Sequence, residues 1–380
     1  MTEKSMADQG MKAVQKSNFT ETFQLFLQHE QLVKQDIAQK LGHSLPTVTT
    51  NLRRLRERDL IVAAGQLSGG LGRRATAYTL NPVAFLSIGM EMFGHHVTTV
   101  ILSARGEILA VHRLEIVFDN AADYYRAVSE DLLAFVGQQD LPVERIIGLG
   151  IGVQGLVSGD GQAIVYGKIL GNTGLTTHEF AQYLPWPVTF LHDADAVAVA
   201  EQTAAKREED AIYLSIGEHL GTAMMINAQT YSGTNGRSGT MEHISIDAEH
   251  GRLCYCGRYG CIETYASISA LLNDRDESID AFFAEVQADE PTAVTRWASY
   301  LDHLAHAINN LHMFADTPIV LAGDLARFIS EQTILDLHER ILQLTAFPES
   351  EPYLRLGQVG QYAVATGAAL PIMQRYVETI

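Results

Sequence analysis

The sequence predicts an α/β protein in which a small, basic helical head precedes a larger, acidic body of two α/β lobes. Charge is unevenly divided: residues 1–82 contain 11 Lys and Arg against 7 Asp and Glu, and the other 298 residues contain 16 against 38. Apolar residues recur at helical spacing in the first part, whereas strand patterns alternate with helical ones in the second. We expect a tail at 1–17, a head at 18–82 and a body at 83–380.

The head contains three predicted helices. Apolar residues between Phe19 and Leu27 line one helical face. A second short helix, QDIAQKL, ends at Gly42, which allows a sharp turn. The third helix is expected from about Ser44, its cap, to Arg58 within SLPTVTTNLRRLRERDL.

The third helix has an outer face suited to DNA, because Val48, Leu52 and Leu55 face inward and leave polar side chains outward. Two short strands follow, LIVAAG and ATAYTL, joined by the Gly-rich QLSGGLGRR, which completes the pattern of a winged helix-turn-helix. A packing or dimerisation module with a solvated charged face is the alternative. We expect contacts to DNA bases, phosphates and the minor groove from Ser44, Thr47, Thr49, Thr50, Asn51, Arg53, Arg54, Arg73 and Arg74.

The body divides into two lobes of similar plan. Extended runs FLSIGMEM, VTTVILSA and EILAVHRL precede a helix from Ala121 and the apolar strand RIIGLGIGV. A related order returns in AIYLSIGE, GTAMMINA, the helical WASYLDHLAHAINNLHMF and the strand PIVLAGD. We expect lobe one at about 83–191, completed by a C-terminal helix at about 361–380, and lobe two at about 192–360, with a ligand cleft between them.

All three cysteines fall within eight residues. His243, Cys254, Cys256 and Cys261 form H-x10-C-x-C-x4-C, a complete tetrahedral ligand set for Zn²⁺. No ligand position remains for water, so the sequence predicts a structural zinc. Three unrelated thiols and a core histidine are the alternative.

The segment that holds these ligands resembles the ROK family of sugar kinases and transcriptional repressors. EHISIDAEHGRLCYCGRYGCIETYAS is similar to the zinc motif of that family, and GIGVQGLV at 150–157, HDADAVAVAE at 192–201 and YSGTNGRSGTMEH at 231–243 extend the likeness. The resemblance implies a winged helix-turn-helix followed by an actin-like (ribonuclease H-like) two-lobed ROK domain. It also implies a zinc-stabilised sugar pocket and assembly into dimers or tetramers.

A sugar site in the cleft is implied by the same resemblance. Asp193 matches the carboxylate that accepts a proton from the sugar hydroxyl in the kinases, here a vestigial base; a capped helix start is the alternative for this residue alone. His192 replaces the family's asparagine, and Thr240 and Glu242 replace its glutamate and glycine, so the ligand need not be a familiar hexose. The implied effector contacts are Gln154, His192, Asp193, Thr240, His243 and Glu263.

The phosphate motifs of the family are altered at three places. D-x-G-G-T is EMFGH at 91–95, G-T-G-x-G-G is GEHLGT at 217–222, and a glycine triplet is AGD at 322–324. A phosphate binds where backbone N–H groups are within its reach. The Phe93 ring would block this approach, and the Glu218 carboxylate would repel the phosphate. We therefore expect no ATP binding and no enzyme activity.

These observations predict a cytoplasmic, sugar-responsive DNA-binding repressor of carbohydrate metabolism genes. The N-terminal MTEKSMADQG lacks an apolar signal core, and no apolar run approaches the ~20 residues of a membrane helix. The partners would be a palindromic operator, a sugar or sugar phosphate, and further copies of the chain. Ligand binding would change the angle between lobes and, through a linker near Asn81 and Pro82, the spacing of paired heads. An active sugar kinase with a DNA-binding head and a regulator that answers to a protein partner are the alternatives.

Overall fold

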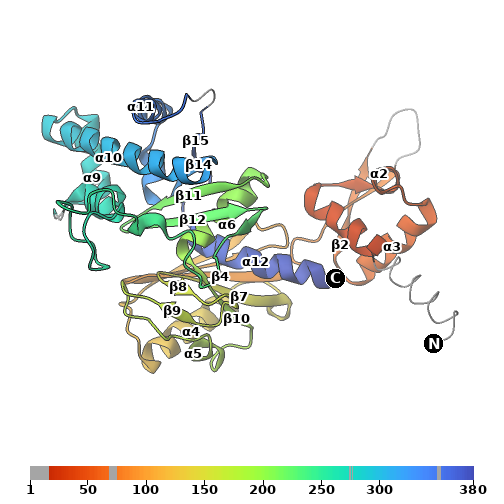
Figure 1. The fold of residues 1–380 in the computed structure, drawn as a ribbon. Helices are drawn as coiled ribbons and strands as arrows, with labels where there is room; N and C mark the ends of the chain where they lie inside the picture. The colour runs from red at the N-terminus through yellow and green to blue at the C-terminus, as the bar shows by residue number, and fades with distance from the viewer. Residues whose placement is uncertain (1–16, 68–74, 274, 276, 349–351) are drawn as a thin grey trace, which may run out of the picture.

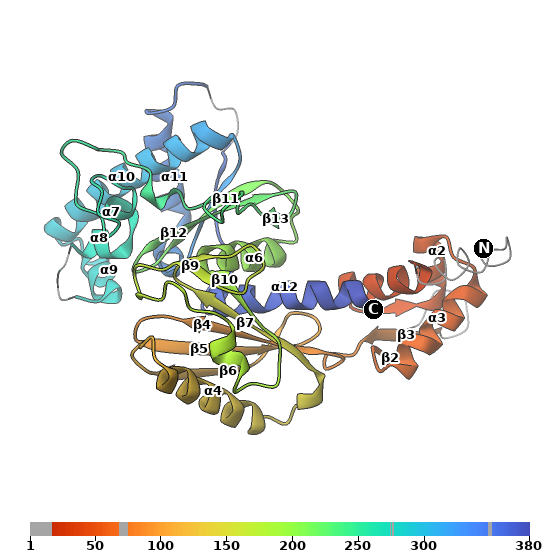
Figure 2. The ribbon, with the colours of Figure 1, turned by 60° about the horizontal axis from the view of Figure 1, so that its bottom comes forward.

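The computed structural model describes residues 17–67, 75–273, 275, 277–348 and 352–380. The expected tail, apart from its last residue, and the expected wing arginines Arg73 and Arg74 lie outside this part of the chain. Figures 1 and 2 show a two-lobed body with the head set apart at one end.

The head combines helices with a small antiparallel sheet of order β1-β3-β2. Its elements in chain order are a helix at 17–28, β1 (Leu32–Val33), α2 (Lys34–Leu41), α3 (Leu45–Glu57), β2 (Ile61–Leu67) and β3 (Ala75–Leu80). The three predicted helices and both predicted strands are confirmed. The two-residue β1 was not expected, because two residues are too few to show a strand pattern.

Local chemistry explains the turn between α2 and α3. Gly42 has a φ of 65°, the left-handed conformation that glycine adopts at little cost. Ser44 then caps α3, since its Oγ accepts a hydrogen bond from the N–H of Thr47 at 3.3 Å. Val48, Leu52 and Leu55 point into the head as predicted.

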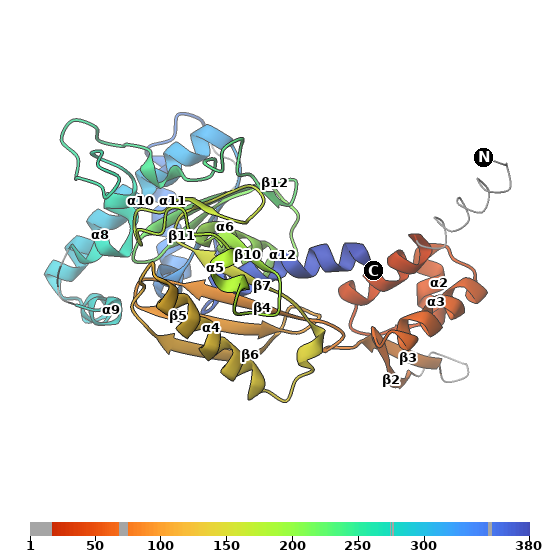
Figure 3. The same ribbon diagram turned by 90° about the horizontal axis from the view of Figure 1, so that it is seen from below.

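Lobe one is built on a five-stranded mixed sheet of order β10-β7-β4-β5-β6. One face is covered by α4 (Ala122–Gly137) and α5 (His178–Ala181), and the other by α12 (Ala363–Thr379) (Figure 3). A hairpin of β8 (Leu156–Val157) and β9 (Ile164–Tyr166) extends beside it. The strands are β4 (Leu86–Met92), β5 (His96–Leu102), β6 (Ile108–Glu115), β7 (Ile146–Val153) and β10 (Val188–His192).

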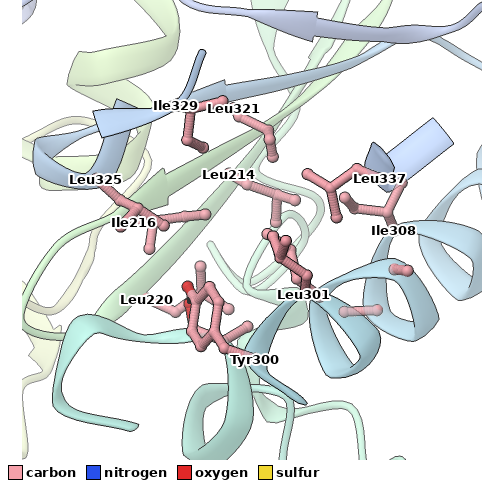
Figure 4. Packing of buried hydrophobic residues seen from close by; sticks show 14 of the residues in the cluster. Leu214, Ile216, Leu220, Tyr300, Leu301, Ile308, Leu321, Leu325, Ile329 and Leu337 are labelled. Carbon is pink, nitrogen blue, oxygen red and sulfur yellow. Dashed lines mark hydrogen bonds between the residues drawn. The ribbon is translucent and has the colours of Figure 1, made fainter. Parts of the chain in front are cut away.

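Lobe two repeats this plan with a sheet of order β13-β12-β11-β14-β15. Its large apolar core lies between the sheet and α10; in Figure 4, Leu214 and Leu321 of the sheet face Leu301 of the helix. The elements are β11 (Ala211–Ile216), β12 (Leu220–Ile226), β13 (Gln229–Thr230), α7 (Glu263–Ala266), α8 (Ile268–Leu272), α9 (Ile279–Gln287), α10 (Pro291–Ala315), β14 (Ile319–Ala322), α11 (Glu331–Leu342) and β15 (Leu354–Leu356).

Two helices pack against each other between the sheets: α12 and α6 (Asp193–Ala205). Glycine makes the packing of α12 unusually close. A Cβ on Gly89 of β4 would lie 1.8 Å from the Ala365 carbonyl oxygen, and one on Gly367 would lie 1.7 Å from that of Ala196 in α6. Backbone therefore lies directly against backbone at both contacts.

The head is tied to lobe one by more than the covalent connection. Arg105 Nη2, from the turn between β5 and β6, donates to the Glu30 carbonyl at 3.2 Å and to Thr79 Oγ1 at 2.9 Å. Arg145 Nη2 lies 3.2 Å from Asp59 Oδ2. The C-terminal end of α12 also reaches the joint, where Tyr376 packs on Phe85 with ring centroids 5.0 Å apart (Figure 2). The predicted linker is thus bridged by side chains.

Within the described residues, no helix combines the length and the apolar character needed to cross a membrane.

Candidate functional site

The predicted zinc ligands converge in lobe two. The ligand atoms of His243, Cys254, Cys256 and Cys261 all lie within 4.8 Å of one another. Cys254 Sγ is 3.6 Å from His243 Nδ1, and Cys256 Sγ is 3.7 Å from Cys261 Sγ. The three cysteines form no disulfide.

This arrangement fits Zn²⁺. A tetrahedral zinc with Zn–S bonds of about 2.3 Å separates its ligand atoms by about 3.5–3.8 Å, which is the spacing of both measured pairs. The loop at 243–261, called the cysteine loop below, is shaped for these contacts. Gly260 has a φ of 74°, and a Cβ there would lie 1.8 Å from the Asp247 carbonyl oxygen. The cluster could therefore hold a four-coordinate structural zinc, with His243 Nδ1 as its nitrogen ligand.

A cavity of about 90 Å³ lies beside the cluster, and most of the expected effector residues line it: Gln154, His192, Asp193, Thr240 and His243. His243 lines the cavity while its Nδ1 lies 3.6 Å from Cys254 Sγ, so the position of this imidazole is compatible with both predicted roles. Sequence reasoning missed Lys168, His219 and Tyr255 in this wall: His219 and Tyr255 lie inside motifs that were interpreted through other residues, and Lys168 lies in a loop without a motif.

Asp193 opens α6 and forms an acid–imidazole pair with His192. His192 Nε2 lies 3.2 Å from Asp193 Oδ1. Burial alone would lower the pKa of His192, but the carboxylates of Asp193, Asp195 and Glu242 raise it above its ordinary value. Burial raises the pKa of Asp193. The helix cap position belongs to His192, and the backbone N–H that Asp193 Oδ1 accepts is that of the next residue, Ala194, which is not the hydrogen bond of a helix cap.

Glu263 occupies a different position from the other expected effector residues. Its side chain is 4% exposed and lies behind the cavity wall. Oε1 is 2.8 Å from His219 Nδ1, and Oε2 accepts the Leu220 N–H at 2.6 Å. Both carboxylate oxygens are therefore engaged with the protein, and Glu263 positions His219, which lines the cavity.

A larger cavity, of about 270 Å³, occupies the other half of the cleft and shares Gln154, Asp193 and His219 with the first. All three altered phosphate motifs meet here, through Phe93, Glu218 and Asp324. Glu91 also lines it and is paired with His96 at 3.0 Å. Burial and the nearby Glu91 raise the pKa of Asp324. Carboxylates thus face the space that a triphosphate would need.

The predicted DNA face of α3 is largely exposed. Ser44, Thr49, Thr50 and Arg53 are exposed, and Thr47 and Arg54 are half-buried. The guanidinium of Arg54 lies over the Phe19 ring, 4.5 Å from its centroid, which holds the side chain along the helix.

The prediction that Asn51 faces outward is wrong. Asn51 is 4% exposed, and its Nδ2 donates to the Asn18 carbonyl and to Thr22 Oγ1, both at 3.0 Å. The side chain points into the contact between α3 and the helix at 17–28. The physical reason is that the inward stripe of α3 is wide enough to include position 51, and the buried amide is satisfied there.

The sequence matches one protein family and several proteins of known role. The model of the ROK family matches residues 87–375. The chain is 28% identical to the xylose repressor of Bacillus subtilis strain 168, over 93% of this chain and 94% of the relative. It is 26% identical to the DNA-binding transcriptional dual regulator NagC of Escherichia coli K12, over 94% of each chain.

Solved structures show the same fold. A ROK family transcriptional regulator, a homolog of the E. coli MLC protein, superposes with a TM-score of 0.74 at 21% identity and covers 96% of this chain and 97% of its own. A ROK family glucokinase from Streptomyces griseus, in complex with glucose and AMPPNP, has a TM-score of 0.64 at 21% identity and covers 76% of this chain and 99% of its own.

Proposed function

Because this chain belongs to the ROK family, we propose that it is a sugar-responsive DNA-binding repressor that no longer transfers phosphate. The relatives that match both head and body over more than nine-tenths of their length are named as repressors or transcriptional regulators. The genes it controls would serve carbohydrate metabolism.

The nucleotide half of the cleft carries this proposal. In a kinase of this fold the triphosphate lies against glycine backbone, whose N–H groups bind its oxygens. Here Phe93 replaces a glycine in the lining of that space, and Glu218 and Asp324 add carboxylates to a lining that also includes Arg113. At a separation of about 4 Å, each carboxylate–phosphate pair costs about 1–4 kcal/mol between the water and protein-surface limits. Several such pairs together oppose ATP.

The head would bind DNA as a winged helix-turn-helix. Helix α3 would enter the major groove with Ser44, Thr47, Thr49 and Thr50 toward base edges, and Arg53 and Arg54 toward phosphates. Asn51 is not among the proposed DNA contacts, because its side-chain amide is buried. Arg73 and Arg74 remain proposed wing contacts from the sequence alone. A dimer or tetramer would present two heads to a palindromic operator.

The cleft would bind a sugar or sugar phosphate between the lobes. Gln154 comes from lobe one, His192 and Asp193 from the boundary, and Thr240 and His243 from lobe two, so a ligand that contacts all of them favours one lobe angle. Bound Zn²⁺ would act as a structural cross-link of the cysteine loop. His243 would then present a fixed ring to the ligand.

A selection experiment with the full chain tests the proposal. Duplexes enriched from a random library should contain a palindrome, and at least one of a panel of sugars and sugar phosphates should weaken binding to it in fluorescence anisotropy. The same preparation, supplied with ATP, Mg²⁺ and each sugar, should release no ADP. Turnover that disappears in Asp193→Asn would establish the kinase alternative instead. No preference for any duplex would refute the repressor.

A further inference from the structure

A further polar cavity, called the second cavity below, adjoins the cavity of about 90 Å³ beside the cysteine cluster, which is called the effector cavity below. The second cavity has a volume of about 250 Å³ and shares His192 and Thr240 with the effector cavity as a common wall. Its other walls come from the turn at 158–161, from α6, from the loop at 230–240 and from α12. None of the roles discussed so far involves this space.

The groups that line this second cavity are open to a ligand. Asp195 of α6 faces it, and within the described residues its carboxylate accepts no hydrogen bond. The hydroxyls of Thr230, Ser232 and Ser238 likewise have no side-chain hydrogen bond within that part of the chain. The Asp195 carboxylate and these hydroxyls suit a ligand that carries several hydroxyl groups.

The lining of the cavity also includes a cation. Arg375 of α12 lines it, and the only polar contact of its guanidinium within the described residues is Thr189 Oγ1 at 3.5 Å. Asp160 also lines the cavity; its Oδ1 accepts from Ser158 Oγ at 2.6 Å and from the Gln162 N–H at 3.1 Å, and within the described residues it forms no ion pair with Arg375. Arg375 therefore remains available to an anionic group.

We propose that this cavity is a second ligand site, which binds a small polyhydroxylated molecule with an anionic substituent. The hydroxyl groups would donate to Asp195 and exchange hydrogen bonds with the loop at 230–240, and the anion would lie at Arg375. A sugar phosphate and a sugar acid share this chemistry. Both differ from a neutral sugar, which has no anionic group to bind Arg375.

The second site is well placed to act on the head. Ala368, Pro371 and Arg375 lie on successive turns of α12, and the residue after Arg375 is Tyr376, which packs on Phe85 at the joint with the head. Pro371 has no N–H to donate, so one backbone hydrogen bond of α12 is missing on the stretch that lines the second cavity. The proposed effect on the head rests on the proposed function, whereas the proposed binding of a ligand in the second cavity does not.

Alkylation protection tests binding at this place. Ser232→Cys puts a thiol in the cavity wall, and peptide mass spectrometry separates it from the native cysteines. The probes are glucose, glucose 6-phosphate, gluconate, N-acetylglucosamine with and without 6-phosphate, and inorganic phosphate, each at millimolar concentration with the full chain. A phosphorylated or acidic sugar should slow alkylation of the new thiol about tenfold when its concentration is about ten times Kd. Asn235→Cys, exposed on the same loop and outside the cavity, should show no protection.

Two matched variants decide the result. In the Ser232→Cys background, Asp195→Asn should abolish protection, whereas Asp193→Asn, two residues earlier and facing the effector cavity, should retain it. The proposal is overturned if no probe protects, if inorganic phosphate alone protects equally well, or if Asp193→Asn rather than Asp195→Asn removes protection. Binding to the selected duplex, measured separately, shows whether the repressor proposal fails on its own.

Discussion

The buried amide of Asn51 gives the sharpest test of how the head works, because the sequence and the structure assign it opposite roles. Asn51→Ala removes two hydrogen bonds from the head, each worth about 0.5–1.5 kcal/mol net. The two acceptors are not left without partners, since Thr22 Oγ1 itself donates to the Asn18 carbonyl at 2.7 Å. The expected loss of stability is therefore in the middle of the range, about 2 kcal/mol.

Hydrogen exchange of the full chain is the suitable assay. The two tryptophans, Trp186 and Trp297, lie in the body, so their fluorescence does not report on the head. A loss of about 2 kcal/mol should accelerate exchange about 30-fold in peptides from the helix at 17–28 when they exchange through opening of the head. Peptides from β7 should exchange as before. Affinity for the selected duplex should fall only when the temperature is high enough to unfold the head.

The neighbouring residue supplies the control. Thr50 is exposed, and its Oγ1 bonds only to the Pro46 carbonyl within the same helix, at 3.1 Å. Thr50→Ala should leave exchange within about 0.5 kcal/mol of the wild type and weaken specific DNA binding at all temperatures. If Asn51→Ala instead kept full protection and lost sequence preference, Asn51 would read bases and the packing argument would be refuted.

Three further predictions concern the body. Cys256→Ser, or a chelator, should release one zinc per chain in elemental analysis and speed exchange in the cysteine loop but not in the head; metal-free protein of equal stability would contradict this. Glu263→Gln offers one oxygen to two donors, His219 and the Leu220 N–H, so it should lower the free energy of unfolding by about 1–3 kcal/mol and weaken sugar binding in calorimetry; unchanged values would disprove the positioning role. Burial raises the pKa of Asp195 to about 6, so its charge destabilises the fold above that pH and this penalty fades below it. Asp195→Asn should therefore raise the free energy of unfolding by about 1 kcal/mol more at pH 8 than at pH 5, and an equal gain at both would count against it.

The parts of the molecule that the sequence predicted well depend on local pattern. Helix α3 has apolar side chains at helical spacing, a serine before it and a glycine before that, and all three signals act within a few residues. The cluster of His243 and the three cysteines, which could hold a metal ion, is equally local, because three of its four residues lie within eight residues of one another. Such features can be predicted without knowing which distant residues pack against them.

The parts that it predicted poorly depend on distant neighbours. Asn51 lies three residues after Val48 and four before Leu55, so helical spacing alone places it beside the buried stripe, but its polar character suggested solvent. Only the contact with the helix at 17–28, some thirty residues away, provides the acceptors that make burial favourable. Glu263 is similar, because its partners His219 and Leu220 lie more than forty residues earlier, at the turn between β11 and β12.

The packing of α12 limits how a ligand signal can reach DNA. Gly89 holds α12 against lobe one, whereas Gly367 opposes α6, which also packs on the sheet of lobe two. The head in turn is fixed to lobe one by Arg105 and Arg145. The head, lobe one and α12 therefore form one packed unit, and we expect any closure of the cleft to move lobe two relative to that unit. A sugar in the cleft would then change the spacing of two heads through contacts of lobe two with a second copy of the chain. The alternative is a change at the C-terminal turns of α12, where the proposed second ligand would bind.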